Sequence, residues 1–294
     1  MDNIEPAVKL PLVVIVGPTA SGKSALAIEM AAKYNGEIIC ADSRTIYKYM
    51  DIGTAKPDAD DKRRVPHWGL DLVEPGEYFS AADFKTYADN KIKEIRQRGH
   101  VPFLVGGTGL YVDSVIFDYQ FGPKADAGVR AILEQKTVLE LQEYCKNNNI
   151  LPENYMNKRH LVRSIETNGE INRLDKSIVK NCIVVGITTE KFEILERIKD
   201  RIIQMIDCGV IDETEILSGK YGWDSESMKS NIYPIIRQYL DKSITKDELI
   251  NRAVTIDWRL AKRQITWLKR NKFIQWGTLV EVKEIIENRL ASTC

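Results

Sequence analysis

The stretch Pro11-Leu-Val-Val-Ile-Val-Gly-Pro-Thr-Ala-Ser-Gly-Lys-Ser24 joins an apolar run to a complete G-x-x-x-x-G-K-S phosphate loop. Residues 24–33 follow with good helix formers and apolar side chains at helical spacing. Strand, glycine-rich turn and helix therefore succeed one another, and backbone N–H groups at the start of such a helix hold phosphate oxygens. We predict a diphosphate site, with Lys23 as a point charge and the Ser24 hydroxyl facing Mg2+, formed by Gly17, Pro18, Thr19, Ala20, Ser21, Gly22, Lys23 and Ser24. Such a loop accepts a diphosphate whether or not it belongs to a nucleotide.

The composition is that of a globular chain, with 294 residues, 44% hydrophobic and 29% charged, enough for one large domain or two modest ones. No apolar stretch approaches the roughly 20 residues that span a bilayer, so we expect a cytoplasmic protein without membrane contact. The 5 cysteines are scattered, which favours reduced thiols, and the presence of only 3 histidines argues against a His-rich metal site. Because the formal net charge is +0, a nucleic-acid partner must be bound by a local basic patch.

Strands are expected at residues 37–41, 101–105 and 182–187. A helix is expected from a Ser80 N-cap, with Asp83 three residues on, to Arg98, and a turn-rich stretch covers residues 51–76. This alternation predicts a P-loop NTPase-like doubly wound parallel sheet, with functional loops at the carboxyl ends of its strands. The loops in that position are residues 17–24, 42–45 and 106–109.

Three regions follow along the chain. Residues 1–122 form the first part of the P-loop core, residues 123–180 a polar helical insertion, and residues 181–294 the rest of the core with C-terminal helices. The spacing of Trp258, Trp267 and Trp276 predicts core side chains of a packed helix and a following strand.

The carboxylate closest to the phosphate chemistry is Asp42, at the end of the second strand, because the third strand ends in Gly106-Gly-Thr-Gly109. Across the crevice from the phosphate loop, Asp42 suits a general base, and Thr108 could hydrogen-bond a departing phosphate oxygen. The alternative is that Asp42 only caps the turn that follows its strand. Spacing alone leaves both open.

Six blocks in order carry a resemblance to the tRNA dimethylallyltransferases. They are Gly17-Pro-Thr-Ala-Ser-Gly-Lys-Ser24, Asp42-Ser-Arg-Thr-Ile-Tyr47, Asp51-Ile-Gly-Thr-Ala-Lys-Pro57, Val65-Pro-His67, Tyr78-Phe-Ser-Ala-Ala-Asp-Phe84 and Val105-Gly-Gly-Thr-Gly-Leu-Tyr111. Weaker similarity continues through residues 157–166, 197–213 and 261–267, so it spans nearly the whole chain.

The resemblance implies transfer of a dimethylallyl group from dimethylallyl diphosphate to N6 of the adenosine 3′ of the anticodon, with release of diphosphate. It implies Mg2+ as cofactor and Asp42, Thr108 and Lys23 as catalytic residues, with Ser43, Arg44 and Thr45 beside a flipped nucleotide. It also implies a tRNA-contacting role for Arg130, Lys158, Arg159, His160 and Arg163 in an insertion shorter than usual, and for Lys262, Arg263 and Gln264. Taken alone, these basic stretches are more simply solvated helix faces.

Three other functions remain open at this stage. The acceptor could be free AMP, ADP or ATP, the chain could bind tRNA without turnover, or it could be a small-molecule kinase. We expect a monomer whose partners are dimethylallyl diphosphate and the anticodon stem-loop of tRNA.

Overall fold

The computed structural model describes residues 10–122, 126–152, 154–169 and 177–292. Their contacts divide the chain into one unit of residues 1–116 and 178–294 and a second unit of residues 117–177. Among the described residues, no helix combines the length and the apolar character needed to cross a membrane.

The larger unit is built on a six-stranded sheet with the order β3-β2-β4-β1-β5-β6, in which every neighbouring pair is parallel. The strands are β1 (Leu12–Val16), β2 (Gly36–Cys40), β3 (His67–Trp68), β4 (Val101–Gly106), β5 (Cys182–Ile187) and β6 (Gln275–Gly277). Strands extend from β1 in both directions, so the loop after β1 lies at the switch point of the sheet, where open parallel sheets bind ligands. The predicted doubly wound sheet is confirmed.

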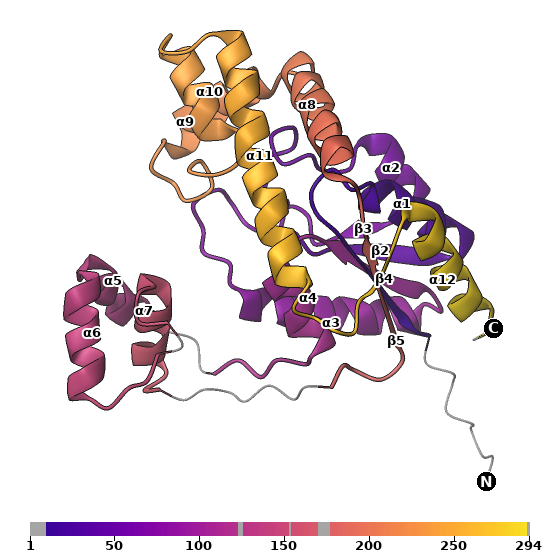
Figure 1. The fold of residues 1–294 in the computed structure, drawn as a ribbon, viewed down its shortest axis with the longest axis horizontal. Coiled ribbons are helices and arrows are strands. Elements are labelled where there is room, and N and C mark those ends of the chain that lie inside the picture. Colours follow the sequence, from indigo (N-terminus) through magenta and orange to yellow (C-terminus); the bar gives the residue numbers. More distant parts are fainter. Residues whose placement is uncertain (1–9, 123–125, 153, 170–176, 293–294) are drawn as a thin grey trace. The chain divides into compact units, whose positions relative to one another are not determined.

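Helices cover both faces of this sheet (Figure 1). On one face α1 (Lys23–Lys33) packs beside the C-terminal helix α12 (Leu279–Ala291), and both contribute to a core with the apolar side chains of the central strands. On the other lie α3 (Ala81–Gln97) and α4 (Gly109–Ile116), which contact each other and β4. The predicted cap of α3 is present, since Ser80 and Asp83 form a reciprocal capping box.

Four further helices gather at one end of this unit: α8 (Lys191–Asp207), α9 (Val210–Tyr221), α10 (Tyr233–Leu240) and the long α11 (Lys246–Leu268) (Figure 1). Helix α11 packs along α8 and reaches α4. An isoleucine-rich core fills the space between α8, α10 and α11.

The stretch predicted as turns contains two short elements, α2 (Ala59–Arg64) and the edge strand β3. A six-residue helix without a buried residue and a two-residue strand are too short to show a periodic pattern in the sequence, so neither could be predicted. The prediction that Trp258, Trp267 and Trp276 belong to the core is also wrong in part, because all three remain partly exposed.

The smaller unit contains α5 (Ala127–Gln135), α6 (Val138–Asn147) and α7 (Lys158–Glu166). It has its own apolar core of Leu133, Leu141, Cys145, Ile150, Leu161 and Val162. The nearly buried Glu166 accepts a hydrogen bond from Arg130 Nε at 2.7 Å and lies 3.4 Å from Arg163 Nη1. Two of the basic residues predicted to contact tRNA therefore also neutralise a carboxylate of this unit.

Candidate active site

The phosphate loop closes on itself at the start of α1. Gly22 adopts φ 89° immediately before the helix, and Ala20 also has a positive φ, 62°. The Ser21 N–H and the Lys23 Nζ both donate to the carbonyl of Pro18, at 3.2 and 3.1 Å. The loop therefore leads directly into the N-terminus of α1, which no side chain of the described residues caps, and helix N-termini of this kind bind phosphate.

Two helices from the second half of the chain contact this loop at Thr19. The Thr19 N–H donates to Gln264 Oε1 of α11 at 2.8 Å. Arg201 of α8 donates from Nη1 to Thr19 Oγ1 at 2.7 Å and from Nη2 to Asp257 Oδ2 at 2.5 Å. These bonds bring an arginine, held by a carboxylate, to the mouth of the phosphate loop.

Asp42 both caps a turn and lines the cavity. Its Oδ1 accepts the Arg44 N–H at 2.8 Å, the capping contact that spacing had left as an alternative. The side chain still faces the cavity that contains Lys23. One carboxylate oxygen orders the turn, and the second is available for chemistry, so the capping and catalytic roles are compatible.

The glycine-rich loop after β4 is tied to the Asp42 turn. Thr108 Oγ1 accepts the Ser43 N–H at 3.1 Å, and the Thr108 N–H donates to the carbonyl of Ala41 at 3.3 Å. A Cβ on Gly106 would collide with the Ala41 backbone, so only glycine permits this approach.

A cavity of about 390 Å³ joins these parts. Eight residues predicted for the site line it: Thr19, Lys23, Asp42, Ser43, Arg44, Thr108, Arg263 and Gln264. The helices α8 and α11 also supply an apolar wall of Ile202, Met205, Ala253, Ile256 and Leu260. The lining of the cavity therefore combines groups suited to an anion with side chains suited to a hydrocarbon group.

The charge of Lys23 responds to these surroundings. Burial lowers the pKa of its ammonium group to about 8, the Asp42 carboxylate raises it, and the Arg201 guanidinium lowers it. A diphosphate in the loop would favour the charged form of Lys23.

The other predicted residues lie elsewhere. Gly17, Pro18, Ala20, Ser21, Gly22 and Ser24 build the loop rather than line the cavity. Thr45 is buried behind Asp42 and donates to its carbonyl at 3.4 Å. Lys262 lies in an open groove with Arg259, Arg263, Thr266, Trp267 and Arg270, and Arg263 also lines the cavity. Arg130, Lys158, Arg159, His160 and Arg163 belong to the smaller unit.

Sequence reasoning missed Arg201 and the apolar wall. A signal for Arg201 was present, because it falls on the stripe of α8 that Ile194, Ile198, Ile202 and Met205 bury. An arginine on the buried stripe of an amphipathic helix points to a charged partner.

The oxygen atoms at this site suit Mg2+. Within the described ranges, no group of three or more His, Cys, Asp or Glu side chains could hold a metal ion. Mg2+ commonly takes only one or two protein oxygens and completes its coordination with phosphate oxygens and water. The Ser24 hydroxyl, in the first turn of α1, and the Asp42 carboxylate are oxygen donors of this kind.

Comparison with known proteins gives a consistent result. The family model described as IPP transferase matches residues 45–271. The tRNA dimethylallyltransferase of Anoxybacillus flavithermus is 37% identical over 292 residues, covering 95% of this chain and 93% of that protein. The full-length tRNA isopentenylpyrophosphate transferase of Bacillus halodurans has a solved structure with a TM-score of 0.74 and 35% identity, covering 97% of this chain and 98% of its own. A second solved structure, that of the tRNA delta(2)-isopentenylpyrophosphate transferase from Staphylococcus epidermidis, has a TM-score of 0.72 and 30% identity, and the match covers 97% of this chain and 100% of its own.

Proposed function

Because this chain belongs to the IPP transferase family, we propose that it is a prenyltransferase that moves a dimethylallyl group from dimethylallyl diphosphate to tRNA. The acceptor is N6 of the adenosine 3′ of the anticodon, position 37, in tRNAs that read codons beginning with U, and diphosphate is released. The observation that carries this proposal is the cavity, which joins the phosphate loop and Asp42 to an apolar wall.

The donor fits this cavity by chemistry. Its diphosphate binds backbone N–H groups at the start of α1, with Lys23 and Arg201 as the two cations. Its dimethylallyl group lies against the apolar wall, where Ile202 and Leu260 exclude water from the reacting carbon. Mg2+ bound by the diphosphate with Ser24 would further neutralise the charge of the leaving group.

Transfer breaks the allylic C–O bond and forms a C–N bond to N6 of adenine. The electron pair of the C–O bond leaves with diphosphate, whose charge Lys23 and Arg201 offset. The proton lost from N6 passes to the Asp42 oxygen that does not hold the Arg44 N–H. The Thr108 hydroxyl, fixed by the Ser43 N–H, hydrogen-bonds the departing phosphate oxygen.

The tRNA reaches the cavity along the basic groove of α11. Arg259, Lys262 and Arg270 supply its positive charge, and Arg263 belongs to both groove and cavity. Phosphate contacts along this groove position the RNA while the target base is extruded into the cavity, at a cost of a few kcal/mol. Lys158, Arg159 and His160 of α7 contact the anticodon region. The protein acts as a monomer in the cytoplasm.

A labelling experiment tests this function. Purified protein is incubated with Mg2+ and radiolabelled dimethylallyl diphosphate, and unmodified tRNA with A-A-A after the second anticodon base is offered in parallel with AMP and ATP. We expect label in the tRNA alone. Label only in a mononucleotide would reassign the acceptor, and label in neither would refute the transferase function.

Arg263→Ala provides a second test, since it should weaken tRNA binding and reduce its salt dependence. A variant that changed only the KM for dimethylallyl diphosphate would contradict the tRNA role of the groove. A small-molecule kinase is excluded as an alternative if ATP is not hydrolysed and no phosphoryl group is transferred.

A further inference from the structure

The loop of residues 51–56, Asp-Ile-Gly-Thr-Ala-Lys, has so far no role in the mechanism. Gly53, Thr54 and Ala55 line the same cavity as Asp42 and Arg44. Ala55 has φ 53°, a left-handed conformation that costs a non-glycine residue about 1 kcal/mol or more and persists only where its surroundings enforce it.

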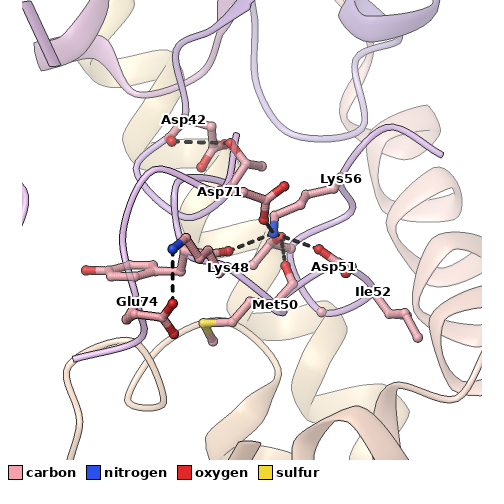
Figure 2. Close-up of polar contacts among 12 residues, drawn as sticks. Asp42, Lys48, Met50, Asp51, Ile52, Lys56, Asp71 and Glu74 are labelled. Atoms are coloured by element: carbon pink, nitrogen blue, oxygen red, sulfur yellow. Dashed lines mark hydrogen bonds and ion pairs between the residues drawn. The ribbon is translucent and has the colours of Figure 1, made fainter. Parts of the chain in front are cut away.

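Lys56 fixes this loop from within. Its side chain is only 1% exposed, and its ammonium group donates to Asp51 Oδ1 at 2.7 Å and Asp71 Oδ1 at 2.6 Å. A third bond, 2.7 Å long, goes to the carbonyl of Tyr47. Figure 2 shows Asp51 and Asp71 converging on the Lys56 nitrogen. All three protons of the ammonium group are thus used to hold the end of the loop.

Glu213, in the first turn of α9, fixes the beginning of the loop. Its Oε2 accepts the N–H groups of Asp51 and Ile52 at 2.8 and 2.7 Å. Its Oε1 accepts the Gly53 N–H at 2.9 Å and the hydroxyl of Tyr233, also at 2.9 Å. A carboxylate that receives four hydrogen bonds is held tightly, because bonds to an ionised acceptor are the strong ones.

Tyr233 packs closely against the loop at Gly53 and restricts where the loop can lie. Its side chain is fully buried, and a Cβ on Gly53 would lie 2.5 Å from its hydroxyl oxygen. The N–H groups of Ala55 and Lys56 donate back to the carbonyls of Ile52 and Asp51 at 3.0 Å each. The loop is therefore set in one conformation before any substrate arrives.

We propose that Glu213 is a positioning residue for the acceptor adenosine, through the part of the cavity wall that the loop of residues 51–56 forms. This inference rests on the proposed function. Donor phosphates bind at residues 17–24, whereas the bonds of Glu213 go to the beginning of the loop and to Tyr233. Relaxing the wall therefore misplaces the nucleotide and leaves donor binding intact.

The test compares Glu213→Gln with Glu215→Gln, an exposed residue of the same helix. A glutamine keeps one oxygen acceptor but turns an NH2 group toward N–H or O–H donors of the loop. We expect kcat/KM for tRNA to fall about 10- to 100-fold, the size of effect that a misplacement near 1 Å produces. The KM for dimethylallyl diphosphate should remain within about twofold of wild type, and Glu215→Gln should behave as wild type.

A merely structural role gives a different pattern. Loss of folded protein lowers kcat for both substrates and leaves both KM values unchanged, and that result would overturn the proposal. So would a rise in the KM for dimethylallyl diphosphate equal to that for tRNA. A wild-type protein without transferase activity would instead refute the proposed function, so the two failures are distinguishable.

Tyr233→Phe keeps the test decisive if Glu213→Gln does not fold. It removes one of the four bonds to Glu213 and leaves the three backbone bonds in place. We expect a fall in kcat/KM for tRNA in the same direction but smaller, with an unchanged donor KM. Unchanged kinetics with tRNA in this variant would also overturn the proposal.

Discussion

Replacement of Asp42 separates its two roles. Asp42→Asn keeps an oxygen that can accept the Arg44 N–H, now 2.8 Å from Oδ1, but the amide cannot accept the proton from N6. Asp42→Ala removes both the cap and the base. The two variants should therefore match in the loss of catalysis and differ in stability.

The magnitudes follow from each contact. Loss of a general base lowers kcat about 100- to 10,000-fold, and we expect this in both variants. Loss of one partly buried backbone-to-carboxylate bond lowers the free energy of unfolding by about 1 to 2 kcal/mol, and we expect this in Asp42→Ala alone. A second effect concerns Lys23, because the Asp42 charge raises its pKa against burial. Without that charge the Lys23 pKa should fall below about 8, so both variants should bind the donor less well at pH 8.

The assay is single-turnover transfer of label from dimethylallyl diphosphate to tRNA, with urea unfolding of the same preparations. An Asn variant that transfers label within about threefold of the wild-type rate would refute Asp42 as the base. An Asn variant as unstable as the Ala variant would refute the separation of capping from catalysis.

Four further results are expected. The KM for dimethylallyl diphosphate should rise as pH increases through about 8, because Lys23 is charged below that pKa and neutral above it, and a flat profile from pH 7 to 9 would contradict this. Arg201→Gln should raise the KM for dimethylallyl diphosphate about 10- to 100-fold, because it removes a charge-assisted contact, and should leave tRNA binding unchanged. Equilibrium binding of inorganic diphosphate to the variant checks this expectation. Glu37→Gln should lower the free energy of unfolding by about 3 kcal/mol. Burial raises the pKa of Glu37, but hydrogen bonds from Arg98, His100 and Trp68 outweigh it and lower the pKa to about 2. The ionised Glu37 therefore stabilises the wild-type fold fully above pH 4.5, and this stabilisation disappears toward pH 2. Urea unfolding over a pH series should show this pH dependence in the wild type and not in the variant. Gly109→Ala should lower the free energy of unfolding by about 2 to 4 kcal/mol. The new Cβ would displace Trp267 and break the 2.6 Å hydrogen bond from Trp267 Nε1 to the buried Asp113. An unchanged melting temperature would disprove this prediction.

The elements that the sequence predicted well are those with a complete local signal. The phosphate loop, the Ser80 capping box and the strand at residues 182–187 each combine a periodic pattern with turn or cap chemistry, and the structure confirms all three. The edge strand β3 was missed because two residues, His67 and Trp68, carry no periodicity. Trp267 was assigned to the core because spacing gives the buried side of a helix, whereas its partial exposure depends on a groove formed by other residues of α11.

The sequence by itself predicted the central strands of the sheet and the phosphate loop, because each of them is signalled by residues within about ten positions of one another. Only the tertiary structure brought Gln264 and Arg201 to Thr19, and Glu213 to the loop of residues 51–56, across separations of up to 245 positions. The glycines of residues 106–109 illustrate the difference. A motif identifies them, but Gly107 and Gly109 are required because Gln264 and Trp267 of α11 occupy the space where a Cβ would stand. Such requirements arise from close packing between distant segments, which leaves no periodic trace in either segment alone.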